Sequence, residues 1–123
     1  MTEHKFTPET PVKLDPPKDD PITMEQLIKC DGVQSDKLYI AIKGQVFDVT
    51  ANQKSYGVGS AYHSLVGRDA SRALGKMSLG PEETNPSISW DYSSLTEQEL
   101  RVMNDWYMFF KNRYNIVGRI SKH

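Results

Sequence analysis

The most hydrophobic stretches of the chain are short and predict a pair of buried strands. Residues 38–42 and 46–49 are rich in β-branched and aromatic side chains, which is typical of strands. Lys43 and Gly44 separate the two stretches and favour a tight turn. We therefore expect a β-hairpin in the core of the fold.

Two capping boxes predict where two helices begin. Thr23 and Gln26 start a short helix that ends near residues 31–32. Thr96 and Glu99 start a longer one. The longer helix carries apolar residues at helical spacing, namely Leu100, Met103, Tyr107, Phe110 and Tyr114. Its apolar face must pack on the hairpin or on a ligand.

The remaining segments are more irregular. Residues 51–60 are rich in glycine and polar residues and predict a shaped loop. Asp69 is suited to cap a helix over residues 70–77, because its carboxylate can accept from the first free N–H groups. Residues 78–94 predict an irregular insertion with a turn or two of helix at most. Residues 117–120 predict a last strand that closes the sheet.

Length and composition favour a single folded unit behind an N-terminal tail. The chain has 123 residues, of which 37% are hydrophobic and 25% charged, as in one globular domain. Five of the seven prolines fall in the first 21 residues and oppose regular structure there. We predict a flexible tail over residues 1–21 and a domain over residues 22–121.

Charge and hydropathy exclude several classes of protein. Lysine and arginine total 15 against 16 acidic residues, with no basic block, so a nucleic-acid partner has no electrostatic support. The longest apolar run has four residues, 39–42, whereas a transmembrane helix needs about 20. The first residues lack the apolar core of a secretory signal. We expect a cytoplasmic protein, with peripheral attachment to a membrane as the alternative.

Few residues are available for metal or redox chemistry. Cys30 is the only cysteine, which excludes an internal disulfide and a thiolate zinc cluster. Of the three histidines, His4 lies in the predicted tail and His123 ends the chain. His63 alone remains inside the domain, so a site with two axial histidines is disfavoured.

An ordered set of short motifs resembles one known family. The motifs are the strand pair at residues 41–50, Tyr56-Gly57 followed by Tyr62, residues 67–74 (GRDASRAL), Asp105-Trp106 and Tyr114-x-x-Val117-Gly118. In this order they resemble the membrane-associated progesterone receptor family, whose domain has the cytochrome b5-like haem/steroid-binding fold. The resemblance implies an α+β domain in which a small mixed sheet and helices form an open pocket.

The resemblance also implies a haem site built on tyrosine. By position, Tyr62 matches the axial ligand, and Tyr56 matches a second tyrosine at the haem rim. Arg113 and Tyr114 stand where the family places a Lys-Tyr pair near the haem. Asp69 matches an acidic residue whose replacement is expected to disturb the pocket. The implied cofactor is ferric, five-coordinate haem with Tyr62 as its metal ligand.

The chemistry of such a site is coherent. A free phenol has a pKa of about 10, so ligation at neutral pH requires that the phenolate be stabilised. Ferric iron provides most of that stabilisation, and a cation such as Arg113 can add to it. An anionic oxygen ligand favours ferric over ferrous iron, which argues against a simple electron carrier.

By resemblance, the protein is a haem-binding accessory protein and not an enzyme. Its partners would be haem-thiolate mono-oxygenases of sterol synthesis at the endoplasmic reticulum membrane, and an uncovered haem face would allow a haem-mediated homodimer. Residues 56–62 lack the two prolines that the family carries in this loop, which motivates an alternative. In it, the same cleft binds a sterol or another apolar molecule without haem, and the protein acts as an adaptor.

Simpler roles remain open for the same residues. Tyr62 can be a tyrosine of the core or rim whose hydroxyl bonds a neighbour. An exposed polar role is favoured for His63 over iron ligation, because adjacent side chains rarely face one point. Asp69 is first of all a helix cap. The aromatic residues of the long helix belong to the core, with part of them at the haem edge.

Overall fold

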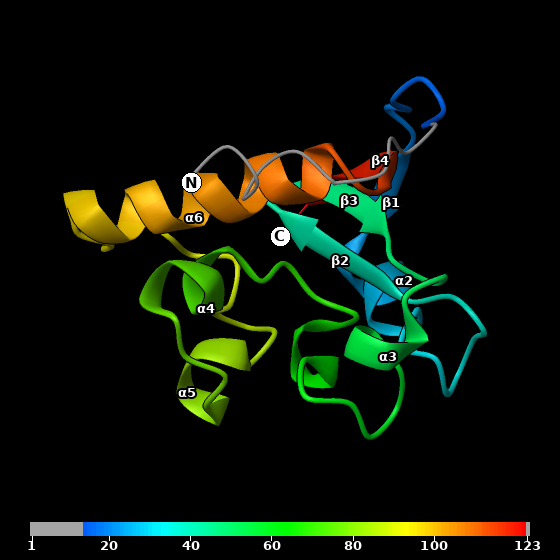
Figure 1. Cartoon of the computed structure of the whole chain (residues 1–123), viewed down its shortest axis with the longest axis horizontal. Coiled ribbons are helices and arrows are strands. Elements are labelled where there is room, and N and C mark those ends of the chain that lie inside the picture. The colour runs from blue at the N-terminus through cyan, green and yellow to red at the C-terminus, as the bar shows by residue number, and fades with distance from the viewer. Residues whose placement is uncertain (1–13, 123) are drawn as a thin grey trace.

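A four-stranded mixed sheet forms the centre of the computed structural model, which describes residues 14–122 (Figure 1). The strands are β1 (Pro21–Thr23), β2 (Tyr39–Ile42), β3 (Gln45–Asp48) and β4 (Asn115–Lys122). Their order is β1-β4-β3-β2, with β1 parallel to β4 and the other pairs antiparallel. The predicted hairpin is confirmed, and the last strand is longer than predicted. The predicted α+β class with a small mixed sheet is also confirmed.

The hairpin turn has the backbone that its sequence favours. Lys43 and Gly44 both have positive φ angles, 54° and 81°. Two successive left-handed residues are characteristic of the type I′ turn, which matches the twist of the flanking strands. The Lys43 ammonium bonds the side-chain oxygen of Asn104 at 2.9 Å, which connects the turn to the helix above it.

Both capping boxes are confirmed. Thr23 and Gln26 begin α2 (Met24–Ile28). Thr96 and Glu99 begin α6 (Glu97–Lys111), the longest helix of the described chain. The remaining helices are short, namely α3 (Gln53–Tyr56), the 3-10 turn η1 (His63–Leu65), α4 (Ser71–Lys76) and α5 (Pro81–Thr84). No helix among the described residues has both the length and the apolar character that crossing a bilayer requires.

The apolar face of α6 packs on the hairpin, as its spacing predicts. Phe110 is fully buried, and its ring meets that of Phe47 edge to face at 5.5 Å. Tyr107 meets Phe47 at 6.0 Å. Gly75 allows α4 to approach the start of α6, since a Cβ there would lie 2.5 Å from Leu95 Cδ1. The two helices can therefore face each other across a narrow space.

The free edge of β2 is covered by the segment that precedes α4. Ala41 donates its N–H to the carbonyl of Arg68 and accepts from the N–H of Ala70, at 3.0 and 2.8 Å. Gly67 donates to Tyr39 at 2.7 Å. An exposed edge strand invites pairing with other chains, and this segment removes that opportunity. It also determines where α4 begins.

Asp69 does not occupy the predicted N-cap position. The cap of α4 is Ala70, because a bridge to Ala41 holds Asp69 in the segment along β2. The carboxylate still serves the first turn of α4, since Oδ1 accepts from the N–H and hydroxyl of Ser71 at 3.0 and 2.6 Å. Oδ2 accepts from the N–H of Gly44 at 3.0 Å. This buried side chain thus joins the hairpin turn to α4.

Part of the predicted tail is held against β4. Lys18 donates its N–H to Ile116, and Arg119 donates its N–H to Asp20. Residues 18–21 therefore lie upstream of the predicted boundary at residue 22 and continue the pairing of β1 along the same side of β4. Residues 1–13, with His4, and residue 123, which is His123, lie outside the described part.

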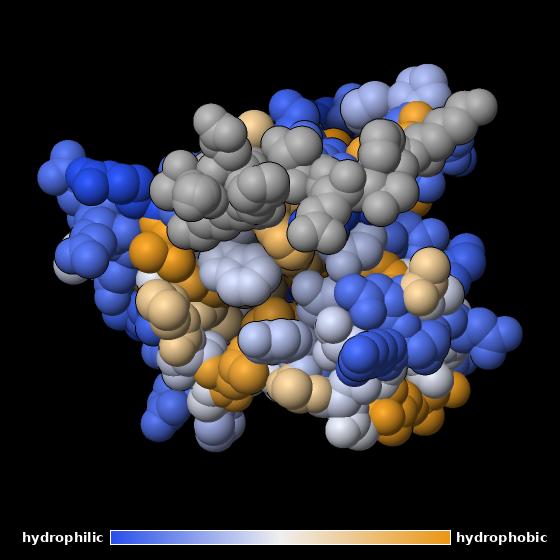
Figure 2. Space-filling model, in the orientation of Figure 1, coloured by the Kyte–Doolittle hydropathy of each residue, from blue (hydrophilic) through white to orange (hydrophobic). Residues whose placement is uncertain are grey.

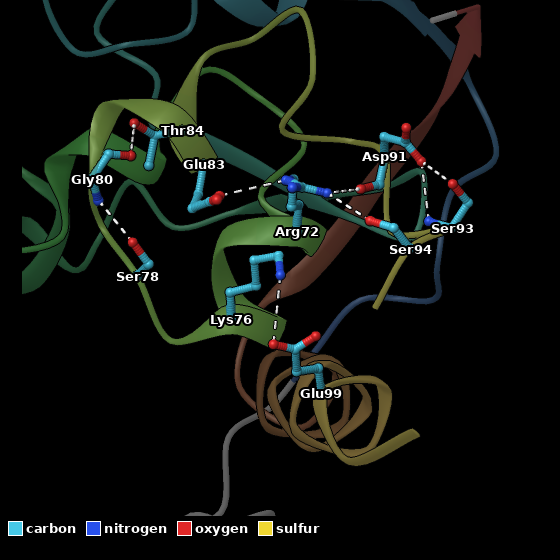
Figure 3. A network of polar contacts seen from close by, with 10 residues as sticks. All are labelled: Arg72, Lys76, Ser78, Gly80, Glu83, Thr84, Asp91, Ser93, Ser94 and Glu99. Atoms are coloured by element: carbon cyan, nitrogen blue, oxygen red, sulfur yellow. Dashed lines mark hydrogen bonds and ion pairs between the residues drawn. The ribbon is translucent and has the colours of Figure 1, made fainter. Parts of the chain in front are cut away.

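The insertion after α4 is irregular apart from α5, as predicted, and Arg72 fastens it (Figure 3). The Arg72 guanidinium lies 3.5 Å from the Glu83 carboxylate and donates to the Ser94 hydroxyl at 3.0 Å. Lys76 and Glu99, 3.6 Å apart, connect α4 to α6. The contacts of Arg72 hold the insertion beside α4, and the ion pair of Lys76 and Glu99 holds α4 beside α6.

Replacing Asp69 is expected to destabilise the whole domain. Asp69→Ala leaves the buried N–H of Ser71 and the partly buried N–H of Gly44 without this acceptor, and we expect the free energy of unfolding to fall by about 2–3 kcal/mol. Urea denaturation followed by circular dichroism measures the change. Asp36→Ala, at an exposed carboxylate, is the matched control and should change stability little. Equal stabilities of the two variants would contradict this role of Asp69.

Candidate functional site

An apolar groove lies between α4, α6 and the loop that leads into η1. It consists of two adjoining hollows, of about 250 and 290 Å³, that share Met77 and Trp106. The first is lined chiefly by Tyr62, Leu65, Leu74, Met77, Leu79 and Trp106. The second is lined by Met77, Val102, Asp105, Trp106 and Phe109. Figure 2 shows apolar side chains gathered below α6 on the side of α4. Taken together, the hollows have the size of small-molecule sites, about 300–1,000 Å³.

Tyr62 lies on the wall of the groove with its side chain 40% exposed. Its backbone N–H donates to the carbonyl of Ser55 at 3.1 Å, which fixes the start of η1. Its ring lies 6.2 Å from that of Tyr56. Within the described chain, the Tyr62 hydroxyl has no hydrogen-bonding partner. An oxygen donor is therefore presented to the groove.

Tyr56 has a different environment from Tyr62. Its side chain is 4% exposed, and its ring packs against those of Phe110 and Tyr114 at 6.0 and 6.3 Å. The hydroxyl of Tyr114 in turn accepts a hydrogen bond from Asn52 Nδ2 at 2.9 Å. Burial, and then the neighbouring Tyr114, raise the pKa of Tyr56 far above that of a free phenol. Tyr56 therefore stays protonated and supports the ring of Tyr62.

Arg113 lies just beyond the end of α6, close to the second hollow. Its guanidinium stacks on the ring of Phe109, 4.4 Å from the centroid. Its Nε is buried and makes no hydrogen bond with the described residues. A buried donor without an acceptor carries a desolvation cost, which a bound acceptor would remove. Arg113 thus brings a cation to the ring of Phe109, which lines the second hollow.

The structure brings together only some of the sequence-predicted site residues. Tyr56, Tyr62 and Tyr114 form a continuous aromatic cluster, and Arg113 follows the same helix. Asp69 is not among the residues that line the groove. It joins the hairpin turn to α4 instead. His63 braces the loop, because its Nδ1 lies 2.9 Å from the carbonyl oxygen of Tyr56.

The two residues that line both hollows were not predicted individually. Trp106 lines both hollows, although its place in the Asp105-Trp106 motif is a signal that could have assigned it. Met77 also lines both hollows, and no sequence pattern points to it. Met77 directly follows α4 and lines the groove because α6 lies opposite. Spacing along the chain does not reveal which helix lies opposite another.

The chemistry of the groove is that of binding. A single phenol oxygen faces an apolar floor, and a cation lies near one end. Such an arrangement can hold a flat apolar molecule that carries a Lewis-acidic centre and an anionic group.

Comparison with known proteins gives a consistent result. Residues 23–111 match the family described as "Cytochrome b5-like Heme/Steroid binding domain". A solved structure of a protein from Arabidopsis thaliana, described as having a cytochrome b5 like fold, is similar with a TM-score of 0.72 and 44% sequence identity. That alignment covers 84% of this chain and 92% of the other. The expected fold is thereby confirmed.

Curated relatives agree with the structural match. The chain is 46% identical to "Probable steroid-binding protein 3" of Arabidopsis thaliana, over 80% of its own length and 95% of that protein. It is 36% identical to "Membrane-associated progesterone receptor component 2" of Rattus norvegicus over 81% of its length, but it spans only 46% of that protein. All residues that line the two hollows lie within the family match over residues 23–111.

The burial of Tyr56 is expected to make stability depend on alkaline pH. The folded-state pKa is raised above the unfolded value of 10.0, so the contribution is complete below pH 10 and declines as the unfolded state ionises above it. Each pH unit above 10 should then cost about 1.4 kcal/mol through this group. Tyr56→Phe should remove that part of the slope, measured by urea denaturation from pH 9 to 11.

Tyr39→Phe is the comparison for this experiment. Burial also raises the pKa of Tyr39, but Tyr39 is only partly buried and should account for a smaller part of the slope. If Tyr56→Phe and the unaltered protein lose stability in parallel above pH 10, the proposed burial effect is contradicted.

Proposed function

Since the chain belongs to the cytochrome b5-like haem/steroid-binding domain family, in the group of membrane-associated progesterone receptor proteins, we propose that it is a haem-binding accessory protein. In this proposal Tyr62 is the axial ligand of ferric haem in the groove between α4 and α6. The observation that carries it is Tyr62 itself, which lines the apolar groove and whose hydroxyl has no hydrogen-bonding partner among the described residues.

The residues of the groove fit such a group. Leu65, Leu74 and Trp106 provide an apolar surface on which a flat ring system can pack. The guanidinium of Arg113, which stacks on Phe109 beside the second hollow, suits an anionic substituent at the edge of a porphyrin. When bound, the ferric iron would supply the positive charge that makes the Tyr62 phenolate stable at neutral pH.

The neighbouring tyrosines have a positioning role in this proposal. Tyr56 stays neutral because it is buried, so it does not compete with Tyr62 for the metal. Its ring and the bond between Asn52 and Tyr114 hold the loop of Tyr62 against α6. One oxygen ligand on an open groove favours ferric iron and haem exchange over electron transfer. An accessory role, and not a catalytic one, follows from this.

We infer the partners from the family rather than from contacts. Haem-thiolate mono-oxygenases of sterol synthesis are the proposed protein partners, with the protein attached peripherally at the endoplasmic reticulum membrane. The groove is open, with Tyr62 40% exposed, so a haem held by one ligand would keep an accessible face. Such a face supports the proposal of a homodimer that forms through stacked haems.

A sterol is the second candidate ligand. The relatives include a protein named for steroid binding, and the lining of the first hollow is almost entirely apolar. A rigid apolar ring system could occupy the same space without using the phenol as a metal ligand. In that case the protein would act as a haem-independent adaptor.

Removing one hydroxyl group is expected to abolish the haem signature. Haemin titrated into the purified protein should give a high-spin ferric spectrum with a phenolate charge-transfer band. Tyr62→Phe should lose that band and weaken binding at least about tenfold, equivalent to ~1.4 kcal/mol. The measurement is an absorption titration of the Soret band, with dissociation constants obtained at several protein concentrations.

Tyr39→Phe serves as the control, since this tyrosine packs on the second core cluster away from the groove. It should bind haemin as the unaltered protein does. No Soret change in the unaltered protein would reject the haem proposal. An unchanged spectrum in Tyr62→Phe would reject Tyr62 as the ligand.

Nuclear magnetic resonance can separate the two ligands. If the sterol alternative is correct, progesterone added to the haem-free protein should shift the amide signals of groove residues such as Leu65 and Leu79. Haemin should then leave those signals unaffected. Tight haemin binding with no response to progesterone would reject the alternative.

A further inference from the structure

Met77 ends α4 in a conformation that methionine rarely adopts. Its φ and ψ angles are 53° and 43°, in the left-handed region. The N–H of Ser78 donates to Ala73 at 3.0 Å and that of Met77 to Leu74 at 3.2 Å, the backbone bonds of a Schellman motif. Glycine makes this motif without strain, whereas a residue with a Cβ does not. The end of the helix therefore does not explain why the residue is methionine.

Lys43 is informative because it is the other non-glycine residue with a positive φ in the described chain. Its side chain is used, since Nζ bonds Asn104 at 2.9 Å and lies 4.7 Å from the ring centroid of Tyr107. Met77 shows no such use among residues 14–122, where its apolar side chain is 78% exposed. Backbone strain of this kind is concentrated at ligand sites, which makes Met77 a candidate for contact with a bound molecule.

The position of Met77 indicates where that partner would bind. Met77 and Trp106 are the two residues that line both hollows of the groove. Tyr62 lines the first hollow and Phe109 the second. A ligand that fills both hollows must pass beside the Met77 side chain.

We propose that Met77 is the retention residue of the groove, whose side chain packs on the bound ring system and covers it from water. This inference rests on the proposed function, since the ring system is the porphyrin held by Tyr62. A thioether is flexible and polarizable and makes favourable contacts with aromatic rings. The left-handed backbone directs this side chain over the groove at the expense of some stability.

Variants of Met77 should change stability and haem retention in opposite directions. Met77→Gly relieves the backbone strain, so its melting temperature should rise by a few degrees. The same variant removes the cover, so haem transfer to excess apomyoglobin should be about tenfold faster. Stopped-flow absorption measures transfer, and differential scanning calorimetry of the haem-free protein measures stability.

Two further variants separate the side chain from the backbone. Met77→Leu keeps both the apolar volume and the strain, and should release haem within about twofold of the unaltered rate. Met77→Asn tolerates the left-handed backbone but is polar, and should release haem as fast as Met77→Gly. This pattern supports a covering role whichever way the stabilities change.

Three results would overturn the inference. Equal rates of haem loss in Met77→Gly and the unaltered protein would reject Met77 as a retention residue while the haem proposal survives. A low-spin spectrum that Met77→Leu abolishes would make the sulfur a metal ligand instead of a cover. No uptake of haemin by the unaltered protein would reject this inference together with the proposed function.

Discussion

The backbone pairing between the edge of β2 and residues 67–70 determines the geometry of the whole groove. It converts an open strand edge into the point from which α4 starts, and the buried carboxylate of Asp69 secures it to both the hairpin turn and α4. If this pairing were displaced, α4 would lose its orientation toward α6. The groove would then lose one of its walls, although no residue of the pairing lines it.

Two tyrosines six residues apart acquire different chemistry from their surroundings. Tyr56 is enclosed by rings, and its pKa is raised because its ionised form would be buried without compensation. Tyr62 lies on the groove wall and leaves its oxygen available. The same residue type thus provides a neutral support and an exposed side chain, and the difference arises chiefly from burial. The proposed site with a single tyrosine ligand depends on this division.

The groove combines rigid and strained parts. Its floor is rigid, because α6 is anchored on the hairpin by Phe110 and the insertion is fastened by Arg72 (Figure 3). Its rim includes Met77, whose left-handed backbone stores strain at the junction of the two hollows. Strain of this kind is commonly found at binding sites, where it is retained because the side chain serves a ligand.

Most local elements and the candidate metal ligand could be predicted from short-range patterns along the chain. The hairpin, both capping boxes and the apolar stripe of α6 depend on short-range spacing, and a run of motifs indicated Tyr62. Which residues meet depends on tertiary packing. That packing places Asp69 between the hairpin turn and α4 rather than in the groove, pairs residues 18–21 with β4, and brings Met77 beside Trp106. These contacts join segments that are distant in the chain, so they depend on how helices and strands pack and not on any local pattern.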